Sequence, residues 1–343
     1  MKHLLLSTIA AVVLGICLGQ QQSAAYEEIK KSDPPPEELG VSVMTFNTKW
    51  LLGSQSQVKA LKEKGIWGLE EKDTEPEIEQ QHQAVATIVA RHAPDILCLQ
   101  EVINEIAAKR FQKTLQSKGM QYTLHFLESR DTYLEQDVVF FSKNNSKNIT
   151  DIKISDPTDP VYPSKCVILT CLLNGEKTAL LGLHLKAVPT EPRAVSRREK
   201  QADAVVNQLQ RLSTAGYATF VLGDLNDWDP IVPDADSSEN ATPTSQVLRK
   251  IKDYVTGGND EMLNSLQWVQ PMEKRYTYNY KGSKTVLDHI LLPTSWKNRV
   301  TGVIIDHNRP EGASDHWPVI LKLKGNETTT NHNRSCAVGG VCF

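Results

Sequence analysis

The sequence predicts an α/β fold in which two mixed β-sheets pack together and are covered by helices. Three observations support this prediction. From residue 41 onward, short apolar runs typical of buried strands alternate with longer stretches that have helical periodicity. Several strand-like runs follow one another across short turns, which favours antiparallel neighbours beside the crossover connections. No internal repeat and no second linker interrupts the pattern, so we expect one domain over residues 40–324.

Local signals assign the individual elements. Residues 77–93 are expected to form an amphipathic helix, because Pro76 suits a first helical turn and apolar residues recur at helical spacing. The dipeptide Asn174-Gly175 separates two strand-like runs and predicts a β-hairpin. The charged stretch 57–75 carries no clear signal. The remaining helices are expected at 103–118 and 193–212, and strands at 41–46, 95–100, 121–127, 137–141, 167–173, 178–185, 219–223, 276–280, 287–291, 303–306 and 319–324.

Composition limits the classes of partner. The chain has 343 residues, is 40% hydrophobic and 23% charged, and carries a formal net charge of −3. This balance is ordinary for a globular protein and excludes a polycation that coats nucleic acid or anionic membranes through its overall charge. An anionic substrate would have to be held by local cations or by a metal ion.

The first residues have the pattern of a targeting segment. Lys2 precedes a mostly apolar run over 4–18, and Ser23-Ala24-Ala25 offers small residues for cleavage. The run is short for a membrane span, so we expect a secretory signal peptide over 1–25, with a signal anchor as the alternative. Residues 26–39 are polar and proline-rich, which predicts a linker.

Asparagine sequons and cysteines agree with export. Cys336 and Cys342 lie in a polar segment, 325–343, which we expect to be a flexible tail in which they could form a disulfide. Cys98 lies inside an apolar run and is expected to be buried. The N-x-[ST] glycosylation pattern occurs at Asn144, Asn148, Asn240, Asn326 and Asn333.

Polar side chains recur where hydrophobic strands end. Any one of them could be a strand cap or the start of a turn. Together they are difficult to explain as turn chemistry, because sheets gather their strand ends on one edge, where these side chains can converge. The stretches are FN at 46–47, QE at 100–101, HLK at 184–186, GDLN at 223–226, LDH at 287–289 and SDHWP at 314–318.

These residue types point to phosphate-ester hydrolysis. Carboxylates and amides are hard oxygen donors, which suit Mg²⁺, Mn²⁺ or Ca²⁺ better than zinc or copper. A histidine beside a carboxylate can transfer protons near neutral pH. A metal ion and such a histidine together fit attack of water on a phosphate ester. The sequence has no G-x-S-x-G nucleophile motif, P-loop or dinucleotide fingerprint.

The ordered set FN, QE, H, GDLN, LDHI and SDHWP resembles the endonuclease/exonuclease/phosphatase superfamily, the DNase-I-like phosphoesterases. The resemblance covers nearly all of residues 41–323, and GDLN with SDHWP is its most specific part. It implies a four-layer α/β sandwich. It also implies a divalent cation, Mg²⁺ first and Mn²⁺ or Ca²⁺ next, with Glu101 as the main ligand and Asn47 and Asp315 near the same ion.

The same resemblance implies catalytic roles. Asp224 would orient or deprotonate the attacking water, and Asn226 would steady the phosphate. His316 would be the catalytic histidine, with Asp288 as the carboxylate that orients it. His184 would be a second histidine that contacts the phosphate or protonates the leaving oxygen.

Substrate contacts follow from a segment similar to pancreatic-type DNases, SRDTYLEQDVVFF. By this resemblance Glu135 would pair with His184, with Asp137 as a rival, while Tyr133 and Arg130 would approach the substrate backbone. Lys186 begins a basic group that could hold phosphates, a solvated helix face being the alternative.

Two further features have a structural explanation that we favour. His289 should point away from Asp288 if both lie on a strand. The alternating Tyr276, Tyr278 and Tyr280 could stack bases, but strand packing explains them as well.

Within this superfamily, the signal peptide and the basic group favour a secreted, metal-dependent endonuclease acting on DNA, with RNA as a second substrate. We expect a monomer with no stable membrane association. A secreted sphingomyelinase-like or other phosphate-ester hydrolase is the alternative, although no convincing apolar docking loop is present. A non-catalytic binding homologue is a third hypothesis, which the complete set of motif residues disfavours.

Overall fold

The computed structural model describes residues 40–66, 69, 74–157, 163–232, 243–255 and 261–325. The expected signal peptide and linker lie outside these residues, as do Cys336, Cys342 and the sequons at Asn240, Asn326 and Asn333. The domain boundaries at 40 and 324 therefore stay predictions. Among the described helices, none combines the length and the apolar character that crossing a membrane requires.

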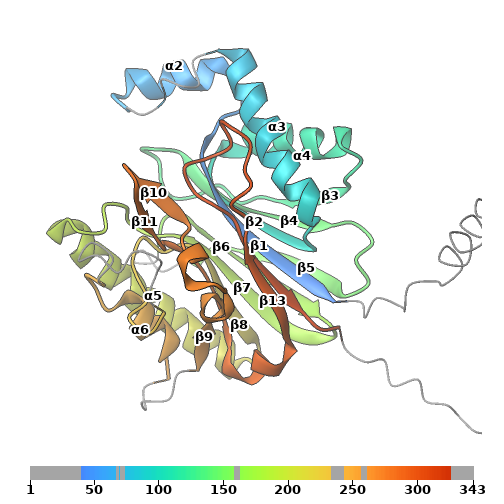
Figure 1. Ribbon diagram of the computed structural model, residues 1–343, viewed down its shortest axis with the longest axis vertical. Helices are drawn as coiled ribbons and strands as arrows, with labels where there is room; N and C mark the ends of the chain where they lie inside the picture. Colours follow the sequence, from blue (N-terminus) through green and yellow to red (C-terminus); the bar gives the residue numbers. More distant parts are fainter. Residues whose placement is uncertain are drawn as a thin grey trace, which may run out of the picture. The chain divides into compact units, whose positions relative to one another are not determined.

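Two six-stranded mixed sheets form the centre of the domain (Figure 1). In each sheet one central pair of strands is parallel, β1 with β2 and β7 with β8, and the other neighbours are antiparallel. The first sheet has the order β13 (Val300–Ile305), β14 (Val319–Leu323), β1 (Val41–Leu51), β2 (Ile96–Ile103), β4 (Gln136–Lys143) and β3 (Tyr122–His125). The second has the order β5 (Ile149–Ser155), β6 (Cys166–Leu173), β7 (Glu176–His184), β8 (Ala218–Asp224), β12 (Asp288–Pro293) and β9 (Met262–Asn264).

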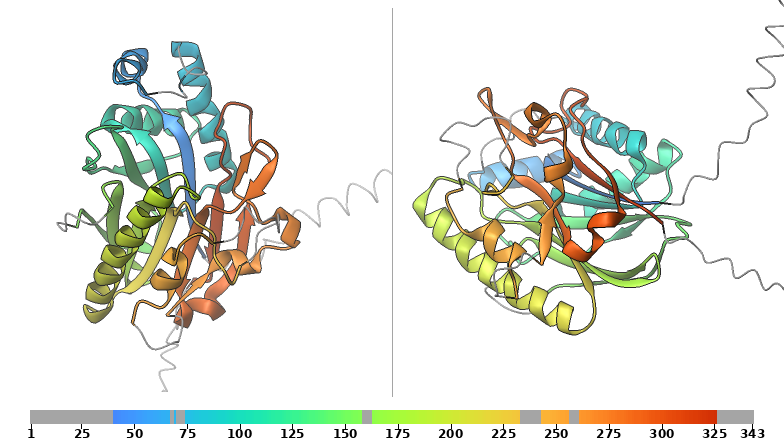
Figure 2. Two further views of the ribbon diagram at one scale, coloured as in Figure 1. Left: turned by 90° about the vertical axis from the view of Figure 1, so that its left-hand side faces the viewer. Right: turned by 60° about the horizontal axis from the view of Figure 1, so that its bottom comes forward.

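The sheets pack face to face through one apolar core. Val43 and Phe140 of the first sheet and Leu180 and Phe220 of the second belong to the same buried cluster. Helices α3 (Glu75–His92) and α4 (Asn104–Ser117) cover the outer face of the first sheet, and α5 (Pro192–Thr214) and α6 (Val247–Lys252) cover the second (Figure 2). The result is the four-layer sandwich, so the fold prediction is confirmed.

Local sequence signals explain several element boundaries. Helix α3 begins at a capping box, in which the Thr74 hydroxyl accepts from the Glu77 N–H and the Glu77 carboxylate accepts from the Thr74 N–H. The predicted hairpin is confirmed as β6 and β7, whose turn places Asn174 and Gly175 at φ 52° and 79°. The smaller hairpin is formed by β10 (Tyr278–Tyr280) and β11 (Ser283–Thr285). Helix α2 (Gln55–Glu63) overlaps the unassigned charged stretch 57–75, and the remaining short elements are the 3₁₀ turns η3 (Ser265–Trp268), η4 (Met272–Lys274) and η5 (Thr294–Arg299).

The topology brings the strand-end motifs together. Because β1 and β2 are parallel, Asn47 lies beside Gln100 at their carboxyl ends, and Glu101 follows directly. The parallel pair β7 and β8 likewise places His184 beside Asp224. On the far side of β8, antiparallel β12 starts with Asp288 opposite Asp224. Both sheets therefore present their polar residues at the same edge of the sandwich.

The loop between β13 and β14, which carries the SDHWP motif, is fastened to helix α3 by Asp306. The Asp306 carboxylate accepts from His92 Nε2 at 2.7 Å and from Arg91, and it also accepts the Asn308 N–H at 2.9 Å. Burial would raise the pKa of Asp306, but these donors outweigh it and lower the pKa below its usual range.

We predict that Asp306→Asn lowers the free energy of unfolding by about 1–2 kcal/mol at neutral pH. Because the pKa is lowered in the folded state, this stabilisation is present above the unfolded-state pKa and is lost as pH falls through the folded-state pKa. Urea unfolding of wild type and variant should therefore differ at pH 7 and converge in strong acid. An unchanged difference across this range would contradict the prediction.

Candidate active site

His316 and Asp288 form a buried pair at the bottom of the site. His316 Nδ1 lies 2.7 Å from Asp288 Oδ2, and because a carboxylate only accepts, this nitrogen carries the proton. His316 Nε2 is left facing Asp224 Oδ2 at 3.9 Å. The Thr277 hydroxyl accepts the Asp288 N–H at 3.0 Å, and the Tyr278 ring packs against the imidazole at 4.7 Å between centroids. The imidazole is thus held in one orientation, with its Nδ1 proton toward Asp288.

The charges in this cluster raise the pKa values of both His316 and Asp224. Burial alone would lower the pKa of His316, but the negative charges of Asp288, Asp224 and Asp315 outweigh it and raise the pKa to about 10. Burial and the neighbouring Asp288 charge raise the pKa of Asp224 to about 7. At neutral pH His316 is therefore a cation that can donate, and Asp224 can take up or release a proton.

Asn47 ties together two carboxylates from the two sheets. Its Nδ2 donates to Glu101 Oε1 at 3.1 Å and to Asp224 Oδ2 at 2.9 Å, while its Oδ1 accepts the Lys49 N–H at 3.0 Å. Glu101, at φ 60°, also accepts the Trp50 N–H at 3.1 Å. Asn47 thus positions both carboxylates, and its expected role as a direct metal ligand stays a prediction.

The acids around the cleft fit a hard divalent cation. Glu101, Asp224 and Asp315 all line the same cavity, and Asp315 lies 3.8 Å from the Lys49 ammonium. Two carboxylates that share one amide donor repel each other, and a cation between them would relieve that repulsion. A second group of possible ligand atoms is Asp224, Asp288 and His316, within 4.8 Å of one another. Because His316 Nδ1 is already bonded to Asp288, we interpret this second group as a proton-transfer cluster.

His184 faces the same two acids from β7. Its Nε2 lies 3.8 Å from Glu101 Oε1 and 3.7 Å from Asp224 Oδ2. Burial, followed by the charge of Lys165, lowers the pKa of His184 well below its usual value, so the ring is neutral near pH 7. Its Nδ1 has no hydrogen-bond partner among the described residues.

The expected pairing of Glu135 with His184 is wrong. The Glu135 carboxylate forms an ion pair with Lys64, and its residue has a positive φ of 55° that turns the chain. The rival Asp137 is buried and accepts the Ser129 N–H at 2.7 Å, so it closes a turn instead. The resemblance to the pancreatic-type segment therefore fails at this position.

Asn226 is fixed by the turn that follows β8. Its N–H donates to Asp224 Oδ1 at 3.0 Å, its Nδ2 donates to the Leu185 carbonyl at 3.2 Å, and its φ is 52°. The turn requires Gly223, whose φ is 134° and where a Cβ would lie 2.0 Å from the Leu183 carbonyl oxygen. The GDLN motif thus presents an acid and an amide to the cleft on a rigid turn.

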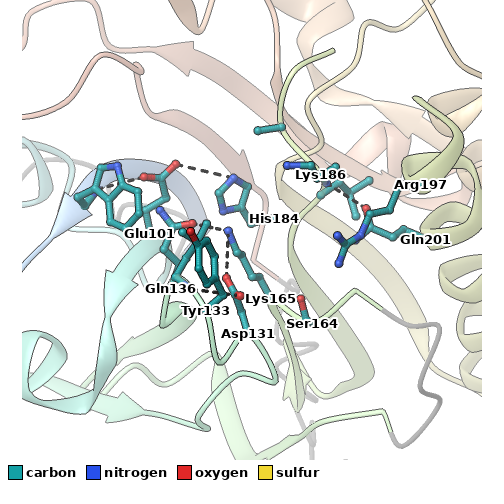
Figure 3. A pocket seen from close by; sticks show the side chains of 14 residues that line it. Glu101, Asp131, Tyr133, Gln136, Ser164, Lys165, His184, Lys186, Arg197 and Gln201 are labelled. Atoms are coloured by element: carbon teal, nitrogen blue, oxygen red, sulfur yellow. Dashed lines mark hydrogen bonds and ion pairs between the residues drawn. The ribbon is translucent and has the colours of Figure 1, made fainter. Parts of the chain in front are cut away.

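Two adjoining cavities open above these residues. The catalytic cleft, about 740 Å³, holds Asp224, Asn226, Asp315 and His316 in its lining. A lateral cavity, about 630 Å³, continues past His184 (Figure 3). The two share the lining residues Trp50, Glu101, His184 and Ala187, which makes them neighbouring parts of one groove.

The expected substrate contacts divide between these surfaces. Tyr133, 60% exposed, and Lys186 line the lateral cavity. Arg130 lines neither cavity: its Nε lies 3.3 Å from Asp156 and its Nη2 donates to the Pro163 carbonyl. These groups hold its side chain, and its expected contact with the substrate backbone stays a prediction. Sequence reasoning missed Lys165, which precedes β6 without any motif.

Packing accounts for Tyr276 and His289, whereas Tyr280 lines the catalytic cleft. Tyr276 stacks on His307 at 4.0 Å between centroids, whereas Tyr280 is 57% exposed and lines the cleft. His289 is buried on the face opposite Asp288, with Nδ1 3.0 Å from Asn264 Nδ2 and Nε2 2.9 Å from the Asp227 carbonyl. The structural interpretation of His289 is confirmed.

A fully buried arginine holds the loop that lines both cavities. Arg198 of α5 donates to the carbonyls of Lys186, Val188 and Pro189 at 3.0, 3.4 and 2.6 Å. Val188 has φ 67°, a strained value for a β-branched residue. The guanidinium therefore keeps a strained loop in place beside His184.

We predict that Arg198→Met destabilises the protein by about 3 kcal/mol, because several carbonyls lose their donor inside the fold. The KM for substrate should rise as the loop relaxes. Exposed Arg193 on the same helix provides the matched control, and Arg193→Met should change stability by less than about 0.5 kcal/mol. Equal unfolding midpoints and KM values for Arg198→Met and wild type would rule out this role.

Comparison with known proteins agrees with the site. Residues 44–316 match the model of the endonuclease/exonuclease/phosphatase family. Among curated proteins, none is similar in sequence. One similar solved structure is truncated TDP2 from Caenorhabditis elegans, with 18% identity over 83% of this chain and 98% of that chain and a TM-score of 0.54. A second is a 3′-5′ exonuclease from Neisseria meningitidis, with 19% identity over 83% of this chain and 100% of that chain and a TM-score of 0.55. A third is an AP endonuclease from Leishmania major, with 13% identity over 83% of this chain and 88% of that chain and a TM-score of 0.59. At these identities the structures support the fold, while the family match runs from before Asn47 through His316, so the chain belongs to the endonuclease/exonuclease/phosphatase family and is a hydrolase acting on phosphoester bonds.

Proposed function

We propose that this protein is a secreted, divalent-metal-dependent endonuclease that hydrolyses DNA, with RNA as a second substrate. The observation that carries the proposal is the convergence of Asp224, His316 with Asp288, and Glu101 in one cleft. This set supplies a proton acceptor, a fixed imidazolium and an anionic cation site around a position for one phosphate.

Each residue has a step that its surroundings support. Asp224, with its pKa near neutrality, accepts the proton of the attacking water. The His316 imidazolium donates from Nε2 to a phosphate oxygen, and the Asn226 amide steadies the same group. Neutral His184 can donate a hydrogen bond, though not a proton, from Nε2 to the leaving oxygen. Glu101 would hold a divalent cation, for which we propose Mg²⁺, and this site would supply charge neutralisation for the phosphate.

The charges beside the cleft favour nucleic acid over sphingomyelin. Lys165, Lys186 and Arg197 line the lateral cavity. Their positive charges attract the phosphates of a polynucleotide and repel the quaternary ammonium of a choline head group, which aromatic cages recognise. A non-catalytic homologue would have no need of the His316–Asp288 pair at 2.7 Å.

We also propose that the protein is a monomer and that it is secreted. Residues 1–25 have the pattern of a signal peptide, and the described sequon Asn144 is exposed on a turn. Expression in a eukaryotic secretory host, followed by N-terminal sequencing of the medium, tests this part. Retention of residues 1–25 in the cell-associated protein would contradict it.

A substrate panel tests the activity. Purified protein should be incubated with plasmid DNA, RNA and sphingomyelin in Mg²⁺, Mn²⁺, Ca²⁺ or EDTA. We expect internal cleavage of DNA that requires a divalent cation. Cleavage of sphingomyelin while both nucleic acids stay intact would overturn the nuclease proposal.

A further inference from the structure

The lateral cavity has a lining that the hydrolytic step does not use. Beyond His184 and Glu101, it is bordered by the start of α5 on one side and by the chain before β4 and β6 on the other (Figure 3). Lys186 and Arg197 reach it from the first side, and Lys165 and Tyr133 from the second. None of these cations contacts the His316–Asp288 pair, so their placement needs another explanation.

The cations outnumber the acids that could balance them. Lys165, with 16% of its side chain exposed, lies 3.4 Å from Asp131 Oδ2 and also donates to the Gln136 side-chain carbonyl. Among the described lining residues, Asp131 is the one carboxylate beside Glu101, which belongs to the cation site. Lys165 is therefore held in place, and Lys186 and Arg197 bring the lining to three cations against the two carboxylates Glu101 and Asp131, although Asp131 and the nearby Glu191 offset part of the charge of Lys186.

The nearby cations also affect the pKa of Lys186. Burial lowers the pKa of Lys186, and the charges of Lys165 and Arg197 lower it further. The Gln201 side chain accepts the Lys186 N–H at 3.0 Å, which fixes the backbone from which this lysine extends. Lys186 and Arg197 are exposed, and a bound anion would relieve the repulsion that Lys165 and Arg197 exert on Lys186.

The walls of the cavity add aromatic surface beside the positive charge. Tyr133 and Trp50 both line it. A phosphate attracted by the cations would bring its attached sugar and base to such rings, which stack on bases of any sequence. The lining therefore combines the two features that bind a nucleotide of a single strand.

We propose that the lateral cavity is a subsite for the nucleotide next to the scissile bond, in which Lys165, Lys186 and Arg197 hold the flanking phosphate. This inference rests on the proposed function. It gives the enzyme a preference for phosphodiesters that carry a second phosphate beside the one cleaved. An isolated phosphodiester would use the catalytic cleft alone.

Short defined substrates test the subsite. The thymidine dinucleotide dTpT has one phosphodiester, and the same dinucleotide with an added 5′- or 3′-phosphate supplies a flanking phosphate on either side. We expect one of the phosphorylated forms to raise the kcat/KM of the wild type about tenfold or more, as for loss or gain of a charged hydrogen bond. The double variant Lys186→Ala/Arg197→Ala should lose this gain, so that its kcat/KM is the same on dTpT and on the phosphorylated forms. Exposed Lys200, on the same helix but outside both cavities, provides the control, and Lys200→Ala should keep the gain.

The outcomes separate the two proposals. Equal rates of the wild type on all three dinucleotides, or a full gain retained by the double variant, would overturn the subsite and leave the nuclease proposal standing. Failure of the wild type to cleave any dinucleotide, RNA or DNA would overturn the nuclease proposal and with it the subsite. If the wild type cleaves no nucleic acid but releases phosphate from an inositol bisphosphate, the lateral cavity would be assigned to a lipid head group instead.

Discussion

Replacing His316 with alanine is expected to lower kcat on DNA by about 10³-fold while leaving the fold intact. The imidazole is buried, fixed by Asp288 at 2.7 Å and charged at neutral pH, so it is prepared to donate a proton or hydrogen bond in the transition state. General acid–base groups of this kind contribute about 10²–10⁴-fold. Initial rates on a supercoiled plasmid, with far-UV circular dichroism of both proteins, would measure the effect.

The control for this variant is another histidine outside the site. His125 lies on the edge strand β3 and contacts the Ser142 hydroxyl at 2.8 Å, and it lines neither cavity. His125→Ala should keep full activity. If folded His316→Ala cleaves as fast as the parent protein, the proposed mechanism is wrong.

The substitution Glu101→Gln is expected to have the second large effect, because it removes the charge that we assign to the main cation ligand. We expect activity at saturating substrate to fall by about 10²-fold or more and the Mg²⁺ concentration for half-maximal rate to rise by a similar factor. The amide remains able to accept the N–H of Trp50, so the fold should be kept. Rates measured across a Mg²⁺ titration separate lost metal binding from lost chemistry.

Glu105 on the next helix is the matched control. It forms an exposed i,i+4 ion pair with Lys109 and lies outside both cavities. Glu105→Gln should leave the Mg²⁺ titration unchanged. An unchanged titration for Glu101→Gln as well would place the cation elsewhere, with the Asp224, Asp288 and His316 group as the remaining candidate.

The sequence predicted the fold because its signals were local and consistent. Apolar runs, the Asn174-Gly175 turn and the helix start at Pro76 each depend on a few neighbouring residues. The elements that were missed are short or exposed: β5 has an alternating burial pattern with few buried residues, and α2 packs its apolar side on a small satellite cluster. Such elements are stabilised by contacts from distant parts of the chain, which periodicity alone does not reveal.

The site residues that could be predicted also differ from those that could not in how local their signals are. Residues at strand ends, such as His184, Asp224 and Asp288, could be predicted because the sheet carries them to one edge. Glu135 and Arg130 lie in an irregular segment between strands, where the choice of partner depends on which side chains happen to be close. Lys165 carries no motif, and its importance appears only when β6 and β7 place it beside His184.

The most direct test of the central claim compares wild type and Asp224→Asn on a supercoiled plasmid, each in Mg²⁺ and in EDTA. Asparagine keeps the shape of Asp224 and its hydrogen-bonded turn but cannot accept the proton of the attacking water. We predict that wild type nicks the plasmid in Mg²⁺ and not in EDTA, and that the folded variant is slower by about 10²-fold or more. Nicking by wild type in EDTA, or an equal rate for the variant, would contradict metal-assisted attack of water at this site.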